Sequence, residues 1–254
     1  WGADAADPAI TDIVPNSSNV VGVMLNITAV NNLPGSASTF FSLTPSPTPA
    51  GSEPATSNMN VAPGRFRSNL AIVPVSADGK VYLYNLAGSA HAILDVVGYL
   101  IANQSPTTRQ GRVVPLVAPF RVFDTRQPEF FETPLPPANA EDWSFTAFVN
   151  DVKVGNEPVG NQVGLLGNLT AANLQRTVSW AGVASYLTAY PTPVGSGTQV
   201  PNVSNIVMSD GEVVPNMALL KYGSNGTDPY QVRFYNRDGY LDYLLDVTAV
   251  ILAD

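Results

Sequence analysis

The only histidine of this chain, His91, limits the histidine-dependent chemistry that the protein could perform, since any serine–histidine triad must use it. His91 comes just after a short glycine-containing turn, and an aspartate, Asp242, stands at the matching position of a repeat described below. We therefore interpret His91 as a solvated turn residue. The 254 residues contain no cysteine, which excludes disulfides, thiolate metal ligands and a cysteine nucleophile.

Aspartates could form the carboxylate pair of a glycoside hydrolase, which needs two carboxyl groups about 5–10 Å apart across a cleft. Asp95, Asp124 and Asp246 lie within strand-like patterns, and their spacing marks no two of them as a pair. Glycoside hydrolysis is therefore the least favoured function, and we expect a protein that is not an enzyme.

Loop aspartates could instead bind calcium, as they do in many acidic β-modules. Asp238 and Asp242 flank a glycine, and three more aspartates cluster at the start of the chain: Asp4, Asp7 and Asp12. The D-x-D-x-D-G spacing of a calcium loop does not occur. We interpret these residues as turn aspartates and predict neither a metal site nor a cofactor.

Aromatic side chains are the candidates for ligand binding, because their flat faces could form a platform for sugar rings. Trp180, Tyr186 and Tyr190 lie close together in SWAGVASYLTAYP, and period-two alternation places both tyrosines on one strand face. Trp143 and Phe145 share a strand face in the same way, which is more typical of a core. Trp180, Tyr186 and Tyr190 are therefore weak ligand-binding candidates.

The segments that carry these residues occur twice in the chain. Their spacing is constant within each repeated block and changes only between blocks, where proline and glycine are frequent, as expected for a β-domain that diverged through loop insertions. The paired blocks are 19–31 with 161–173, 57–69 with 204–216, and 81–100 with 232–251.

Each block has the pattern of a β-strand. Val23, Leu25 and Ile27 alternate with smaller or polar residues, glycine-containing turns follow the strands, and no helical period extends over 11 or more residues. We predict an all-β fold with two tandem antiparallel β-sandwich-like domains of one repeat type. The first β-module comprises residues 1–104 and the second residues 105–254, joined by a polar linker.

Composition restricts the partners. A net charge of −8 argues against nucleic acid, which requires a basic surface. No run of 18 apolar residues occurs, so we expect no membrane span. Because the chain begins at Trp1, we expect a processed protein or a fragment.

The order of the blocks resembles a known repeat domain. The matching stretches are LNIT (25–28), SNMN (57–60), NL (69–70) and DVVGYL (95–100) in the first half, and RVFDTR (121–126), NLT (168–170), SN (204–205), Asn216 and DV (246–247) in the second. Together they resemble the RLLDTR…LNVT…SNLN…DVVGYF domain of secreted proteins from actinobacteria, related bacteria and some of their phages. The resemblance covers most of the chain. It implies an extracellular β-module used as an appendage or in an array, and it implies no activity.

The first module departs from this pattern because it has no counterpart of the RVFDTR strand. We therefore predict that it is incomplete by itself. Residues 1–14, the linker segment 105–118 or a neighbouring subunit could supply the missing strand.

Polar residues recur on the strand face opposite the core. Asp95 and Asn26, and likewise Asp246 and Asn168, are predicted to lie on neighbouring strands and to brace the sheet as structural residues. The apolar face of the last strand is predicted to comprise Leu245, Val247, Ala249 and Ile251.

Taken together, the sequence favours a non-enzymatic extracellular structural or binding protein, part of a bacterial surface, a filament or a phage virion appendage. Protein partners that give or receive a β-strand are expected. A module that binds cell-wall carbohydrate is the alternative, with a polysaccharide as its partner.

Overall fold

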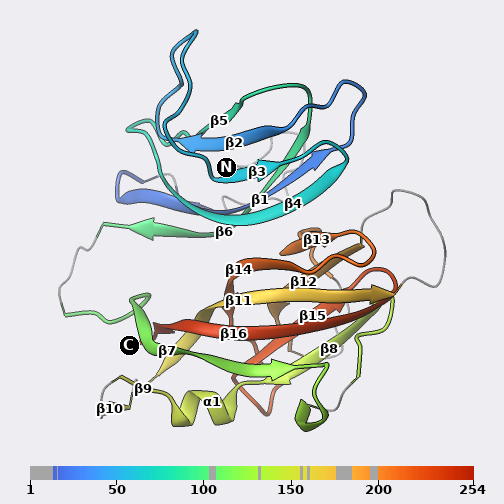
Figure 1. The fold of residues 1–254 in the computed structure, drawn as a ribbon. Helices are drawn as coiled ribbons and strands as arrows, with labels where there is room; N and C mark the ends of the chain where they lie inside the picture. Colours follow the sequence, from blue (N-terminus) through green and yellow to red (C-terminus); the bar gives the residue numbers. More distant parts are fainter. Residues whose placement is uncertain are drawn as a thin grey trace. The chain divides into compact units, whose positions relative to one another are not determined.

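The fold is described here from a computed structural model, which covers residues 14–15, 17–102, 107–130, 133–154, 157–158, 161–175, 185–194 and 200–254. Within these ranges the chain is almost entirely β, as the sequence predicted (Figure 1). It divides into two compact units, residues 1–106 and 107–254. The sequence placed this division two residues earlier.

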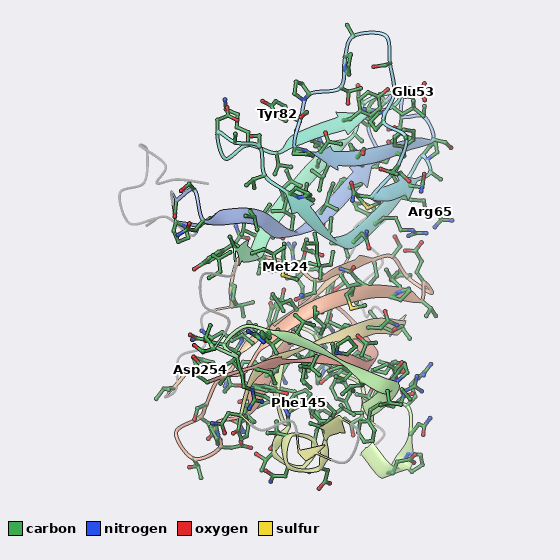
Figure 2. The ribbon with its side chains drawn as sticks, turned by 90° about the vertical axis from the view of Figure 1, so that its left-hand side faces the viewer. Met24, Glu53, Arg65, Tyr82, Phe145 and Asp254 are labelled. Atoms are coloured by element: carbon green, nitrogen blue, oxygen red, sulfur yellow. The ribbon has the colours of Figure 1, made fainter. Side chains whose placement is uncertain are left out.

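The described part of the first unit consists of two antiparallel sheets with three strands each. The long-strand sheet has the order β4 (Arg65–Pro74), β1 (Val20–Asn31), β6 (His91–Ile101). The short-strand sheet has the order β3 (Met59–Val61), β2 (Thr39–Thr44), β5 (Tyr82–Asn85). Side chains fill the space between the two sheets (Figure 2).

The described part of the second unit has two sheets with four strands each. The long-strand sheet has the order β14 (Val214–Lys221), β11 (Gln162–Gln175), β16 (Tyr240–Leu252), β7 (Val113–Asp124). The short-strand sheet has the order β13 (Ile206–Met208), β12 (Ser185–Pro191), β15 (Gln231–Asn236), β8 (Asn139–Ser144). The remaining elements are the 3-10 helix η1 (Pro128–Phe130), helix α1 (Thr146–Asp151), and the short pair β9 (Lys153–Val154) and β10 (Glu157–Pro158).

The two units share one strand order. Strands β4-β1-β6 correspond to β14-β11-β16, and β3-β2-β5 correspond to β13-β12-β15, so each pair of repeated blocks falls on strands at equivalent positions. The second unit adds β7 beside β16 and β8 beside β15. The described part of the first unit has no strand at either of these places.

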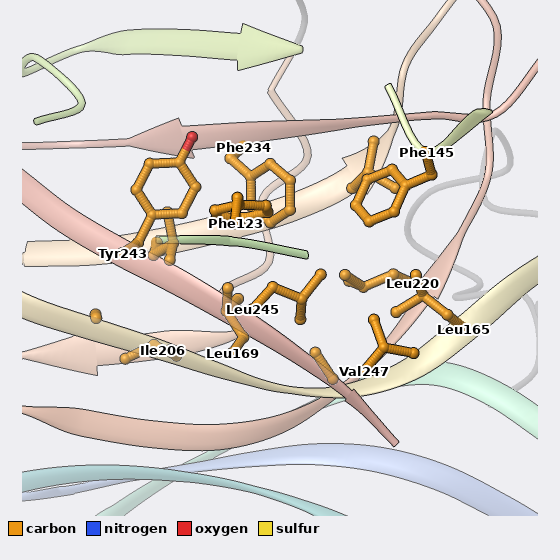
Figure 3. Close-up of a cluster of buried hydrophobic side chains, with 14 of the residues drawn as sticks. Phe123, Phe145, Leu165, Leu169, Ile206, Leu220, Phe234, Tyr243, Leu245 and Val247 are labelled. Carbon is orange, nitrogen blue, oxygen red and sulfur yellow. The ribbon is translucent and has the colours of Figure 1, made fainter. Parts of the chain in front are cut away.

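Each unit has its own hydrophobic core between its sheets. In the first unit the core includes Val23, Leu25, Ile27, Phe41, Met59 and Val73. Figure 3 shows the core of the second unit, in which Phe123, Phe234 and Tyr243 pack against Leu169 and Leu245. Burying large side chains of this kind contributes about 1.5–3 kcal/mol each, so each unit contains the apolar surface that stabilises a fold.

A β-bulge in β16 corrects the core face that the sequence predicted. Opposite β11, Val247 pairs with Gly167 and Ala249 with Leu166, so that Thr248 is an extra residue. An extra residue exchanges the two faces of the strand beyond it. The core cluster therefore continues with Val250 and Leu252. The prediction of Ile251 at a core position was wrong, and Ala249 is buried but lies outside this cluster.

The same irregularity occurs in the first unit. Opposite β1, Val96 pairs with Leu25 and Gly98 with Met24, which makes Val97 the extra residue. The bulge is therefore part of the repeated architecture.

Candidate functional site

The asparagines shared by the two copies bond the backbone of their own unit. The side-chain oxygen of Asn58 accepts a hydrogen bond from a β2 amide at 2.6 Å, and Asn205 accepts one from a β12 amide at 2.6 Å. The side-chain amides of Asn69 and Asn216 donate to the carbonyl oxygens of these two residues, at 2.7 and 2.6 Å. The Ser-Asn block therefore ties the short-strand sheet to β4 and to β14.

The second shared pair, Asn85 and Asn236, closes the hairpin turn before the last strand of each unit. Their side-chain amides donate to the carbonyl oxygens of Gly88 and Gly239, at 3.0 and 2.6 Å. Both glycines have positive φ angles of +64° and +70°, a conformation that side chains rarely adopt. The Thr39 hydroxyl, at the start of β2, donates to the side-chain oxygen of Asn85. The Ser185 hydroxyl, at the start of β12, donates to that of Asn236 in the same way. The asparagines shared by the two copies therefore stabilise the fold of each unit.

The RVFDTR segment forms the charged cluster of the second unit. Arg121 donates from Nε and Nη2 to the two carboxylate oxygens of Asp246, at 2.7 and 2.9 Å. Asp124 is fully buried and accepts two hydrogen bonds from the Arg126 guanidinium, at 2.8 and 2.7 Å. A bond from Arg121 at 3.2 Å adds to them. The hydrogen bonds from Arg126 lower the pKa of Asp124, and burial raises it. The hydrogen bonds have the larger effect, so the pKa lies below its usual value.

Thr125 fastens this segment to the neighbouring strand. Its amide donates to the Tyr243 carbonyl oxygen at 3.1 Å, and its hydroxyl accepts from the Tyr243 amide at 3.0 Å. The same hydroxyl donates to Asp242 at 3.2 Å. Each residue from Arg121 to Arg126 that carries a charge or hydroxyl group is therefore engaged in joining β7 to β16 or in closing the turn after β7.

The four predicted bracing residues lie where their strands meet. Asn26 is directly opposite Asp95, and Asn168 is directly opposite Asp246. In the second unit, however, the Asp246 carboxylate is bonded by Arg121, and the Asn168 amide donates to Thr170 at 3.4 Å. Their bracing role stays a prediction, and sequence reasoning missed the arginine as the partner of Asp246.

Aromatic residues meet on the outer face of the short-strand sheets. The rings of Tyr186 and Tyr235 are 6.1 Å apart, and the Arg237 guanidinium lies 5.5 Å from the centre of the Tyr186 ring. At the equivalent place in the first unit, the rings of Phe40 and Tyr84 are 5.8 Å apart. Both units therefore present an aromatic pair on this face.

The other two aromatic candidates contribute less. Tyr190 lies on the same strand as Tyr186 but is only 8% exposed, and burial raises its pKa. Next to it, Arg233 donates to both carboxylate oxygens of Asp142, at 2.8 and 2.7 Å. Trp180 lies outside the described residues.

Trp143 and Phe145 do not share one strand face, because β8 ends at Ser144 and α1 begins at Thr146. Trp143 stacks on Phe123 with 4.3 Å between ring centres, and its indole N–H donates to Tyr243 at 2.7 Å. Phe145 is 1% exposed. Phe145 therefore belongs to the core, and Trp143 is partly buried and packs against it.

The remaining candidates lie apart from one another. His91 is the first residue of β6 and is exposed. Within the described residues, no three His, Cys, Asp or Glu side chains are placed to hold a metal ion. Asp4, Asp7 and Asp12 lie outside these residues. Among the described helices, none has the length and apolar character needed to cross a bilayer.

A groove between β7 and α1 was not foreseen from the sequence. Its walls include Leu116, Phe120 and Phe148, and the signal that pointed to it is the apolar run VVPLVAPF at 113–120, which is long for a half-exposed strand. Comparisons of the chain with known protein families, with curated proteins and with solved structures find no significant match.

Proposed function

We propose that this chain is a non-enzymatic extracellular structural or binding protein, part of a bacterial surface, a filament or a phage virion appendage, and that it assembles by accepting a β-strand at β6. The observation that carries this proposal is the difference between the units. Strand β7 pairs with β16 in the second unit, whereas no described strand pairs with β6 on the side away from β1.

An open strand edge exposes N–H and C=O groups that other chains can bind, and proteins generally cover or disrupt such edges. Part of the linker can be eliminated as the cover, since residues from Val113 onward belong to β7 of the second unit. Residues 1–13 lie outside the described part of the chain. A strand from a neighbouring subunit supplies the missing ladder in the mode known as β-strand addition.

Strand β7 indicates the chemistry of the partner strand. In the second unit Arg121 of β7 pairs with Asp246, and Asp95 holds the position of that aspartate in the first unit. A strand that resembles β7 would place an arginine next to Asp95. We therefore expect a partner strand that is largely apolar and carries one arginine at this register.

The test is assembly of the full chain. Ile93 on β6 and Ile72 on β4 are both exposed, at 49% and 57%, so a lysine at either place leaves the core intact. Lysine on an edge strand opposes strand addition. Ile93→Lys is expected to reduce oligomers or filaments, measured by sedimentation velocity and electron microscopy. Ile72→Lys is the matched control, because no described strand pairs with the outer side of β4 or of its counterpart β14.

Two results would contradict strand addition at β6. One is a wild-type chain that stays monomeric at every concentration and with its native material. The other is assembly that Ile72→Lys and Ile93→Lys weaken equally, which would indicate a general effect of charge.

Carbohydrate binding is the second candidate, and the repeated aromatic pair favours it. Tyr186 and Tyr235 with Arg237 form a surface of aromatic and polar groups, which suits a sugar ring. Binding of cell-wall polysaccharide in a pull-down, lost in Tyr186→Ala with Tyr235→Ala, supports this function. Retained binding in the double variant excludes this face.

Glycoside hydrolysis stays the least favoured function. Its general acid must keep a proton near neutral pH, which requires a raised pKa. The arginine next to Asp124 lowers the pKa of this carboxyl group, and Asp246 is held by Arg121. Asp124 is therefore not suited to donate a proton.

A further inference from the structure

Strand β7 leaves its hydrogen-bonded ladder for four residues. Pro115 lies opposite Ala249 and Phe120 opposite Val247, so that residues 116–119 have only one residue of β16 beside them. Pro115 and Pro119 also lack the N–H group that a ladder requires. This segment bends out of the sheet and forms one wall of a groove.

Helix α1 and the end of β8 form the opposite wall. The groove encloses about 480 Å³, which lies in the range of small-molecule sites. Its lining is mainly apolar and includes Leu116, Phe120, Trp143 and Phe148. Phe120 is 54% exposed, although it contacts the Phe148 ring with 5.7 Å between centres. Apolar side chains left open in a concave surface indicate a binding site.

Asp151 is the only ionisable side chain among the described residues that line the groove. It makes no hydrogen bond or ion pair with any described residue, and it is the last residue of α1, where helix carbonyl groups also favour a cation. The other polar side chain, Ser144, already donates to Asp228. One carboxylate is therefore available beside three aromatic rings.

We propose that this groove binds an organic cation, an ammonium group on an apolar body. Aromatic faces and a carboxylate attract an ammonium group, while the apolar walls take up the carbon chain. The net charge of −8 raises the local concentration of cations around the protein. A free alkylamine and a lysine side chain of a partner protein share this chemistry. The site belongs to the second unit alone and does not depend on strand addition at β6.

Three probes of equal chain length test the charge preference on the chain of 254 residues: octylammonium, octanol and octanoate, measured by calorimetry. Octylammonium is expected to bind about tenfold more tightly than octanol, a difference expected for a cation held by a carboxylate and aromatic rings. Octanoate is expected to bind most weakly. Equal affinity for octylammonium and octanoate would overturn the proposal.

Asp151→Asn and Phe120→Ser change exposed side chains, and each is expected to weaken octylammonium binding about tenfold. Glu53→Gln makes the same charge change on a loop of the first unit (Figure 2), and Val213→Ser removes an apolar side chain that is 62% exposed elsewhere. Both controls should bind as the wild type does. Binding that survives Asp151→Asn, or that Glu53→Gln weakens equally, contradicts the site.

A peptide with one lysine between leucines distinguishes the source of the cation. Tighter binding of this peptide than of octylammonium assigns the groove to a protein partner, and weaker binding assigns it to a free amine. Either result supports the site if Asp151→Asn abolishes the preference over the same peptide with norleucine in place of lysine. The site is wrong if the norleucine peptide binds equally well to the wild type.

Discussion

At the scale of single residues, the shared motifs are explained by the hydrogen bonds of the backbone. Asn58 and Asn205 each satisfy a strand amide with the side chain. Asn85 and Asn236 do the same for the carbonyl group of a turn glycine. Leaving a buried amide or carbonyl unpaired costs about 1–3 kcal/mol, so these positions tolerate few substitutions.

Asn58→Ala is expected to lower the free energy of unfolding by about 1–2 kcal/mol, because the β2 amide loses its acceptor at 2.6 Å. Asn60→Ala is the matched control two residues away, since Asn60 is exposed and bonds only the Ser57 hydroxyl. We expect the control to change stability by less than about 0.5 kcal/mol. Urea unfolding measures both, and equal effects would refute the role of Asn58.

Asp124 should make the stability of the second unit depend on pH in a definite direction. Arg126 lowers the pKa of Asp124 in the folded state, so the unfolded chain binds the proton more readily. This stabilisation is complete above the unfolded pKa near 3.8 and is lost as pH falls through the lower folded value.

Asp124→Asn tests this linkage. At pH 7 the variant is expected to unfold about 2–3 kcal/mol more easily, because two guanidinium groups lose a buried partner. The difference from wild type should shrink as pH falls below about 4. Urea unfolding at a series of pH values measures it, and a difference that is constant down to pH 2 would exclude this ion pair as its origin.

At the scale of elements, the sequence predicted those features that depend on the pattern of neighbouring residues. Period-two alternation and glycine turns located the strands of both copies. Helix α1 was not predicted, because its six residues, TAFVND, are too few to show a helical period. The Arg121–Asp246 ion pair was not predicted, because its members are 125 residues apart in the sequence. They meet through the pairing of β7 with β16. The groove was not predicted, because it forms where residues 116–119 leave the hydrogen-bonded ladder between β7 and β16.

The bulge at Thr248 gives the element-scale prediction. Inserting one alanine after Thr248 adds a second extra residue, which would shift the strand beyond it by one and turn Val250 and Leu252 from the core to the opposite face. The expected loss is about 3 kcal/mol or more, from the burial of two aliphatic side chains. Thr248→Ala keeps the residue count and loses only a 3.2 Å bond to Leu166, so it should cost about 1 kcal/mol. Equal stability of the two variants, measured by urea unfolding, would show that the register can slip without loss.

At the scale of the whole molecule, one architecture occurs twice, and the second unit extends it. The second unit adds β7 and β8 to the repeated six strands, and this addition also brings the charged cluster and the groove. The first unit keeps the shared asparagines and the bulge, and its described residues provide no strand beside β6. The elements added to the repeat therefore line the groove that we propose as a binding site, whereas the proposed assembly edge, β6, belongs to the repeat itself.

This difference predicts how the two units behave when they are expressed separately. Residues 107–254 contain a complete core and both added strands, so this fragment is expected to unfold cooperatively as a monomer. Residues 1–106 also contain a core, but no described strand among them pairs with the outer edge of β6, and this edge should make the fragment self-associate. Sedimentation velocity and urea unfolding compare the two.

A peptide of residues 113–126, the β7 strand with its RVFDTR end, should bind the 1–106 fragment and suppress this association, because it offers the strand that the second unit already has. The same peptide with Arg121→Ala keeps the backbone groups and lacks the guanidinium, so it should bind more weakly if the arginine meets Asp95. A 1–106 fragment that is monomeric, stable and indifferent to both peptides would mean that the edge of β6 is already satisfied within the chain, and strand addition from a partner would then be wrong.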